Sequence, residues 1–129
     1  MTDDAVQHIH SSAELESLFS STTYVALDFY ADWCPPCKTI APFYASLAAK
    51  HSVPGTLAFA KVNVDNVQDV AAQYRVAAMP TFLFFKEGNK VAVNGHQMIQ
   101  GADPRLLGAA AEKLGGLARK RQEAAEEGK

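Results

Sequence analysis

The chain has 129 residues, of which 48% are hydrophobic and 20% charged, and its net charge is −2. This composition suits one packed domain with room for a tail and argues against disorder. The nearly neutral charge gives no reason to expect nucleic acid or a membrane surface as a partner. The acidic N-terminus lacks the apolar core of a signal peptide, and no apolar stretch approaches the length that spans a bilayer. We therefore expect a cytoplasmic protein. Separately, we expect it to act as a monomer.

Apolar periodicity and turn residues predict the elements of the first half of the chain. A capping box at Ser11–Glu14 starts a helix, since Leu15, Leu18 and Phe19 follow at helical spacing. Pro42 is expected to interrupt the next helix, because proline lacks the N–H that a helix interior uses. In chain order we expect a short edge strand around 6–9, this first helix, a strand at 24–30, a helix at 35–50, a strand at 57–64 and a helix at 67–74.

The second half predicts a hairpin and a closing helix. Thr81–Phe85 is a continuous apolar strand, Glu87–Asn89 a tight turn and Val91–Val93 the returning strand. Asp103 offers an N-cap directly before Pro104, which suits the first position of the closing helix. A βαβ beginning followed by a hairpin predicts an α/β fold. Its central mixed sheet should have four to five strands, with helices on both faces.

The end of the chain changes character after Gly115 and Gly116, which we expect to weaken the closing helix. Residues 117–129 are rich in Lys, Arg, Glu and Ala, with few apolar positions to offset the entropy lost on ordering. We therefore predict one domain over 1–116 and a charged helical extension or flexible tail over 117–129. The basic cluster Arg119–Arg121 is not interpreted as a nucleic-acid patch, because glutamates follow at once.

The most informative motif is Trp33–Lys38, which reads Trp-Cys-Pro-Pro-Cys-Lys and follows the apolar strand directly. Cys34 and Cys37 are the only cysteines of the chain. Their spacing lets the sulfurs close a small ring when the second cysteine lies in the first turn of a helix. The first then lies near the helix N-terminus, where free N–H groups and the helix dipole favour a thiolate. Pro35 and Pro36 suit such a helix start. The motif predicts a dithiol–disulfide exchange site.

Three other roles for a cysteine pair fit less well. A zinc site normally takes four ligands, yet there is no second cysteine pair and the histidines are scattered. Haem attachment would place a histidine after the second cysteine, where Lys38 stands. A purely structural disulfide is rare in the cytoplasm, where we expect this protein. Because the zinc and haem patterns are both missing, we expect no metal.

Asp28 and Lys61 each interrupt an apolar strand, and each has two interpretations. Asp28 has apolar neighbours on both sides, so burial should raise its pKa; alternatively it is an edge carboxylate bonded to a side chain. Lys61 is either the partner of Asp28 or a solvent-facing residue of an alternating strand. Most X–Pro bonds are trans, so the residues alone favour a trans bond before Pro80.

Along residues 5–115 the chain resembles the thioredoxin family. The matching segments, several of them far apart in sequence, are Asp28–Lys38, Ala41-Pro42, Lys61–Asp65, Pro80–Phe82 and Gly101-Ala102. The resemblance implies the thioredoxin fold and a protein-disulfide reductase. Such a protein acts on disulfide-containing protein substrates and is recycled by thioredoxin reductase. No metal or bound organic cofactor is implied, since the dithiol carries the electrons.

The resemblance also implies a role for each matching residue. Cys34 would attack the substrate disulfide, and the more buried Cys37 would resolve the mixed disulfide. Asp28 would be a buried proton acceptor, with Lys61 as its partner. The bond between Met79 and the following proline would be cis, which leaves the backbone of Met79 free to pair with an extended substrate. The substrate groove would consist of Trp33, Pro35, Pro36, Ala78, Met79, Pro80, Gly101 and Ala102.

Two departures from the family pattern concern the site itself. Pro35 stands where glycine is common, so one N–H that could reach the Cys34 sulfur is missing. Tyr30 stands where many members have a second tryptophan. The alternative to an enzyme is a redox-switched adaptor of the same fold, whose C-terminal helix and tail would dock on a partner.

Overall fold

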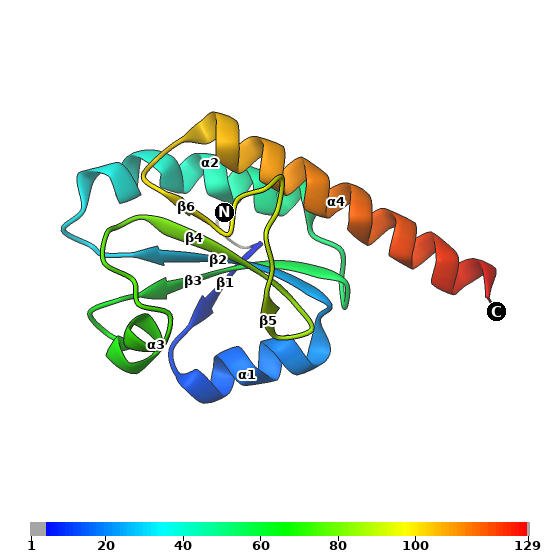
Figure 1. The fold of residues 1–129 in the computed structure, drawn as a ribbon, viewed down its shortest axis with the longest axis horizontal. Helices are drawn as coiled ribbons and strands as arrows, with labels where there is room; N and C mark the ends of the chain where they lie inside the picture. Colours follow the sequence, from blue (N-terminus) through cyan, green and yellow to red (C-terminus); the bar gives the residue numbers. More distant parts are fainter. Residues whose placement is uncertain (1–4, 129) are drawn as a thin grey trace.

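The computed structural model describes residues 5–128, which form one sheet between two layers of helices (Figure 1). The strands are β1 Val6–Ile9, β2 Tyr24–Tyr30, β3 Leu57–Asn63, β4 Thr81–Lys86, β5 Asn89–Lys90 and β6 Met98–Gln100. The helices are α1 Ser12–Ser21, α2 Pro35–His51, α3 Gln68–Gln73 and α4 Pro104–Glu127. The strand order is β1-β3-β2-β4-β5, and β6 also pairs with β4. β1, β3 and β2 run parallel, whereas β4 is antiparallel to β2 and to both short strands.

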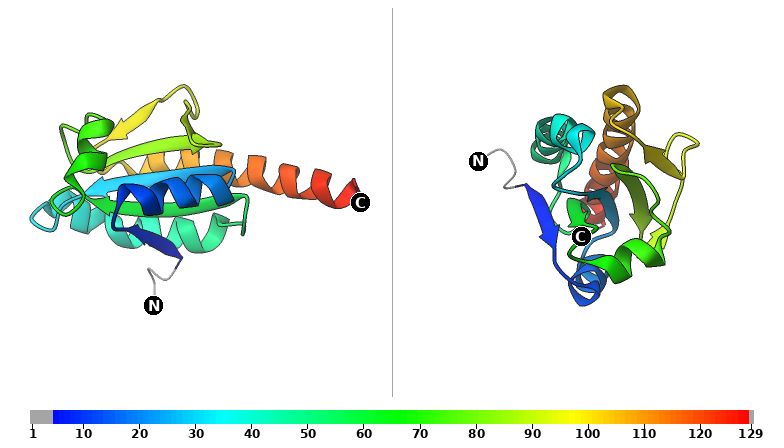
Figure 2. Two further views of the ribbon diagram at one scale, coloured as in Figure 1. Left: turned by 90° about the horizontal axis from the view of Figure 1, so that it is seen from below. Right: turned by 90° about the vertical axis from the view of Figure 1, so that its left-hand side faces the viewer.

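Each face of the sheet carries two helices, and each pair closes its own apolar core (Figures 1 and 2). α2 and α4 cover one face, where Tyr44 and Phe82 are fully buried. α1 and α3 cover the other, where Leu15 and Phe85 belong to the second core. β4 supplies residues to both cores because successive side chains of a strand point to opposite faces. The expected α/β fold with a mixed sheet and helices on both faces is confirmed.

The segment that follows β4 pairs with it in two short strands, whereas the sequence predicts one continuous returning strand. Glu87 and Gly88 have φ of 52° and 81°, so a two-residue turn leads directly into β5. The expectation that Val91–Val93 forms the returning strand is wrong. After Val91, whose N–H still donates to the Phe84 carbonyl oxygen of β4 over 2.9 Å, the chain leaves the sheet and turns again at Asn94 and Gly95, whose φ values of 53° and 84° interrupt extended backbone. The return is therefore split into β5 and β6, and the described residues form six strands rather than four to five.

A buried hydroxyl anchors α2 to the sheet. The Tyr44 hydroxyl oxygen lies 3.0 Å from the carbonyl oxygen of Ala26 on β2 and 2.9 Å from that of Ala60 on β3. The single hydroxyl proton is shared between these two acceptors. Pro42 lies inside α2 without ending it. The helix thus has a fixed position over β2 and β3, and its first residues meet the end of β2.

α4 continues through the two glycines that the sequence predicts to weaken it. The helix runs to Glu127 and projects beyond the sheet (Figures 1 and 2). Gly115 is buried against α2, since a Cβ at this position would lie 2.6 Å from Nδ1 of His51. The His51 ring is also buried, and neither ring nitrogen has a hydrogen-bond partner within residues 5–128. This glycine allows two helices to approach closely. It does not end a helix.

The chain after Gly116 is packed further than expected. Leu117 lies against the core between the sheet, α2 and α4, and Ala118 is fully buried. Of the described residues after Gly116, only 119–128 are exposed. Arg121 reaches Glu87 in the β4–β5 turn, with 3.5 Å between Nη2 and Oε2. The division into 1–116 and 117–129 stays a prediction, and the packing favours a boundary after Ala118. In the part of the chain that the structure covers, none of the helices has the length and apolar character needed to cross a membrane.

Gly115→Ala is expected to lower the free energy of unfolding by about 1–3 kcal/mol, because the added methyl group must displace the buried His51 ring. Gly116 is the matched control, since nothing lies within 4 Å of a Cβ built there. Gly116→Ala should therefore gain up to about 1 kcal/mol from helix propensity. Urea unfolding measures both variants. Effects of the same sign would contradict a specific contact at Gly115.

Ending the chain at Gly116 should lower the free energy of unfolding by roughly 1–3 kcal/mol, because the burial of Leu117 and Ala118 is lost. Ending it after Arg121 removes only exposed residues and should cost less than about 0.5 kcal/mol. The comparison is made by denaturant unfolding of the two shortened chains beside the full chain. An unchanged stability of the shorter one would show that α4 needs nothing beyond Gly116.

Candidate active site

The cysteine pair lies where the chain passes from β2 into α2, at one end of the sheet (Figure 1). Cys34 is the N-cap of α2 and Cys37 is its third residue. The two form a disulfide, with their Cα atoms 5.3 Å apart. Cys34 is 4% exposed and Cys37 5%. The expectation that Cys37 is the more buried is therefore wrong for the disulfide form, in which the ring covers both sulfurs equally. What distinguishes the two cysteines is what they contact.

The Cys34 sulfur lies among groups that favour negative charge. The backbone N–H of Cys37 donates to it over 3.2 Å. The first turn of a 17-residue helix also directs its free N–H groups and the positive end of its dipole toward the sulfur. Pro35 and Pro36 form the exposed start of this turn and contribute no N–H. Once the disulfide is reduced, this arrangement favours the thiolate of Cys34 over that of Cys37.

The loop before β4 packs against the disulfide. The carbonyl oxygen of Met79 lies 3.6 Å from the Cys34 sulfur, and Met79 packs against the small cluster that Ala31 and the two cysteines form. The Met79–Pro80 bond is cis, as the family resemblance implies. The exposed Ala78 accepts a hydrogen bond from the Thr81 hydroxyl over 2.6 Å, which fixes this loop to the start of β4.

Gly101 and Ala102, which follow β6, belong to the same end of the sheet. The Gly101 N–H donates to the carbonyl oxygen of Pro80 over 2.8 Å, and its φ of 93° requires glycine. Ala102 packs partly against the core beneath α2 and α4. The structure thus places Gly101 directly beside the loop that touches Cys34. Ala102 is linked to the disulfide only through Gly101, the residue before it in the chain.

Trp33 is the most exposed of the large apolar residues in the described chain, at 64%. Its indole Nε1–H donates to Oδ2 of Asp65 over 2.9 Å. A ring so exposed has few packing contacts to fix it, so this bond determines how Trp33 lies beside Cys34. The sequence analysis places Asp65 in a matching segment without giving it a role, because nothing local joins two residues that are 32 positions apart.

Asp28 lies on β2 directly across from Lys61 on β3. Its side chain is 3% exposed, and its Oδ1 has no hydrogen-bond partner within residues 5–128. Burial raises the pKa of Asp28 from 3.8 to about 7, although the positive charge of Lys61 lowers it. Of the two interpretations of Asp28, the structure agrees with the desolvated carboxylate.

Lys61 is half-buried. Within residues 5–128 it forms no ion pair with Asp28. Its Nζ lies 5.1 Å from the centroid of the Tyr30 ring, within the range of a cation–π contact. Lys61 is therefore neither simply solvent-facing nor in contact with the carboxylate. The sequence analysis misses the contact with Tyr30, which depends on the pairing of β2 with β3.

Asp28 and Lys61 line two hollows, and Cys37 lines one of them. Asp28, Cys37 and Lys61 share one of about 180 Å³. This volume exceeds the roughly 30 Å³ that one water molecule occupies in the liquid. A second hollow of about 240 Å³, under α2, also reaches Asp28 and Lys61. The buried carboxylate and the inner cysteine thus face the same space.

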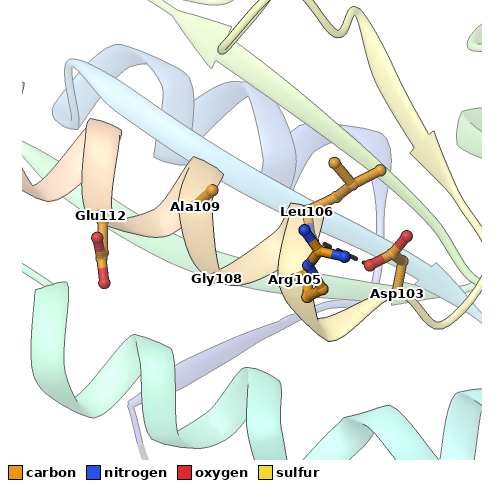
Figure 3. A pocket seen from close by; sticks show the side chains of 6 residues that line it. All are labelled: Asp103, Arg105, Leu106, Gly108, Ala109 and Glu112. Carbon is orange, nitrogen blue, oxygen red and sulfur yellow. Dashed lines mark hydrogen bonds between the residues drawn. The ribbon is translucent and has the colours of Figure 1, made fainter.

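A larger hollow of about 670 Å³ lies on the outer surface of α4 (Figure 3). Asp103 at its end caps the helix by accepting the Leu106 N–H over 3.1 Å. The hollow is lined by Asp103, Arg105, Leu106, Gly108, Ala109 and Glu112, none of which is among the site residues predicted from the sequence. Within residues 5–128, no group of three or more His, Cys, Asp or Glu side chains is arranged to hold a metal ion. This hollow contains neither cysteine, so the chemistry is argued from the disulfide and the hollow that Cys37 shares with Asp28.

Comparison with known proteins agrees with this geometry. A family model described as thioredoxin matches residues 6–104. A thioredoxin-like protein of Fusarium culmorum is 72% identical over 116 residues, which cover 90% of this chain and 96% of that protein. A thioredoxin of Neurospora crassa is 62% identical over 122 residues, covering 95% of this chain and 96% of its own. Among solved structures, Plasmodium falciparum thioredoxin superposes with a TM-score of 0.74 at 36% identity, over 84% of this chain and 98% of its own.

Asp28→Asn is expected to raise the free energy of unfolding at neutral pH, because it removes a desolvated carboxylate. Well below pH 3.8, the ordinary pKa of this carboxyl, the group is protonated in both the folded and the unfolded chain, so the gain should vanish there. As the pH rises from 3.8 toward about 7, the unfolded chain becomes ionised while the folded chain keeps most of its proton. The gain should then grow by about 1.4 kcal/mol per pH unit and level off above the folded-state pKa. Guanidinium unfolding from pH 4 to 8 measures it. A difference that is constant with pH would contradict the raised pKa.

Proposed function

This chain belongs to the thioredoxin family and is a thiol–disulfide oxidoreductase that reduces protein disulfides, and we propose that Cys34 is its nucleophile and Cys37 its resolving cysteine. The observation that carries this assignment is the position of Cys34 as the N-cap of α2. There its sulfur receives the Cys37 N–H and the helix dipole. Cys37 faces the inner hollow with Asp28.

The reaction follows from these positions and transfers two electrons to the substrate. The Cys34 thiolate attacks one sulfur of the substrate disulfide, which breaks that bond and releases the other substrate sulfur as a thiolate. Cys37 then loses its proton and attacks the Cys34 sulfur of the mixed disulfide. The second substrate thiol leaves, and the Cys34–Cys37 disulfide forms. The structure corresponds to this oxidised product.

Asp28 is proposed as the acceptor of the Cys37 proton. A general base works best when its pKa lies near the working pH, and the pKa of about 7 meets this condition. Asp28 and Cys37 line the same hollow, which is wide enough for water to relay the proton. Lys61 lines it too, and its positive charge stabilises the ionised carboxylate.

The substrate is proposed to bind as an extended segment across the surface around Cys34. Trp33, Pro35 and Pro36 form the exposed rim on the α2 side. Met79 lies beside Cys34, where its main chain would pair with the substrate in the manner of a strand, and Gly101 holds this loop through its bond to the Pro80 carbonyl oxygen. Ala78 and Ala102 extend this surface on each side, with small side chains that leave room for a main chain.

Members of this family are reduced by thioredoxin reductase, and we propose the same recycling partner for this chain. A cytoplasmic location is proposed with it, because the cycle needs a compartment in which the dithiol is kept reduced. We also propose that the chain acts as a monomer, because the cysteine pair, Asp28 and Lys61 already meet at one end of its own sheet.

Cys37→Ser should trap mixed disulfides with protein substrates, because the Cys34 thiolate still attacks and nothing resolves the product. Cys34→Ser is the matched control and should trap none. Both variants are incubated with insulin as the disulfide substrate and separated on non-reducing gels, and the wild type should accelerate insulin reduction by dithiothreitol. Equal trapping by the two variants would contradict the assignment of the nucleophile.

A further inference from the structure

Lys61 stands at the junction of three hollows beside the proposed proton acceptor. It lines the hollow under α2, the hollow shared with Cys37, and a third of about 100 Å³ on the β1 side that His8 and Asn63 also line. Tyr30 lines the last two. The ammonium group therefore has room to move, and its position is set by the groups that hold it.

The observed position of the ammonium group is over Tyr30 and not on Asp28. Nζ lies 5.1 Å from the Tyr30 ring centroid. Asp28 is the direct register neighbour of Lys61, yet over residues 5–128 no ion pair joins them and Oδ1 of Asp28 has no hydrogen-bond partner. A lysine next to a bare carboxylate in a buried site would ordinarily pair with it. The tyrosine ring supplies the competing contact.

We propose that Tyr30 is a positioning residue for the proton step: its ring holds the Lys61 ammonium off the Asp28 carboxylate, so that no ion pair joins the two and Lys61 acts on the carboxylate only from a distance. The inference rests on the proposed role of Asp28 as proton acceptor. A cation–π contact at a partly desolvated site is worth about 1–2 kcal/mol, enough to compete for one flexible lysine side chain.

The consequence for Asp28 concerns its affinity for a proton. An opposite charge within about 4–6 Å lowers a carboxyl pKa by roughly 1–3 units. With Lys61 on Tyr30, burial dominates and the pKa stays near 7. Were the ammonium in contact, Asp28 would remain ionised at neutral pH and would be a weaker base toward Cys37.

The other groups around Asp28 do not replace Lys61. The Tyr44 hydroxyl from α2 is occupied by the carbonyl oxygens of two strands. Cys37 and Lys38 from α2 and Asp32 from the preceding loop line the shared hollow, and His8 on β1 lies beside Lys61 in register. Lys38 and Asp32 have opposite charges and are exposed, so solvent screens both.

The experiment compares Tyr30→Leu, which removes the ring, with the matched control Tyr30→Phe, which keeps it. In full-length oxidised protein, the Asp28 carboxyl is titrated by carbon NMR from pH 4 to 9. We expect Tyr30→Phe to titrate close to the wild type and Tyr30→Leu to titrate at least one pH unit lower. Adding Lys61→Met to Tyr30→Leu should reverse that shift, because the counter-ion is then gone.

An unchanged Asp28 titration in Tyr30→Leu would overturn the proposal, as would a lowered titration that Lys61→Met does not reverse. Circular dichroism checks the fold, and Tyr30→Ile, a better strand former, serves in place of leucine if that variant unfolds. The titration requires no turnover, so its outcome is separate from the proposed function. The proposed role of Asp28 has its own test: it would be contradicted if the Asp28→Asn variant reduced insulin as fast as the wild type.

Discussion

The proposed proton transfer depends on a carboxyl group, Asp28, that is buried in the sheet and forms no ion pair within residues 5–128. Burying an ionised group is unfavourable unless hydrogen bonds or an opposite charge compensate it. At Asp28 the compensation is weak: Tyr44 donates to backbone carbonyls, and the Lys61 ammonium lies over Tyr30 and acts on the carboxylate only from a distance. The carboxyl group therefore binds a proton at a pH where ordinary aspartates do not. A better-satisfied site would be more stable and less able to take a proton from Cys37.

The position of α2 makes this carboxylate useful. The helix begins at the end of β2 and is held over β2 and β3 by Tyr44, so its N-terminus cannot shift without breaking a buried hydrogen bond. That end of the helix supplies the field for Cys34, while the inner side of its first turn places Cys37 over the hollow that Asp28 shares. One anchored helix thus gives the two cysteines the different surroundings on which their proposed roles rest.

Much of this arrangement could be predicted from sequence where the determining interactions are local. The bounds of β2, the Ser11 and Asp103 caps, and the start of α2 at Pro35 follow from periodicity and capping chemistry. The raised pKa of Asp28 also follows, since its neighbours in the strand are apolar. The cis bond before Pro80 required the family resemblance, because the residues alone favour trans.

Contacts between elements that are far apart in sequence were not predicted. The bond from Trp33 to Asp65 and the stacking of Lys61 on Tyr30 depend on strand register and loop placement. Gly115 was misinterpreted for a related reason: propensity treats glycine as a weak point, whereas here the absent side chain makes room for His51. The split return after β5 turns at Asn94-Gly95, a strong turn dipeptide, but only the pairing of β5 and β6 with β4 shows that this turn lies outside the β4–β5 hairpin.

That split return also affects how the sheet meets other molecules. A long, flat edge strand offers a row of unpaired backbone groups onto which another chain can add, and aggregation often starts there. Here one edge is β1, with four residues, and the other consists of β5 and β6, with two and three. The loop between β5 and β6 interrupts the row, so within residues 5–128 neither edge offers a long run of unpaired backbone. If substrates pair with backbone beside the disulfide as proposed, the described edges of the sheet give them little competition from a second copy of the chain.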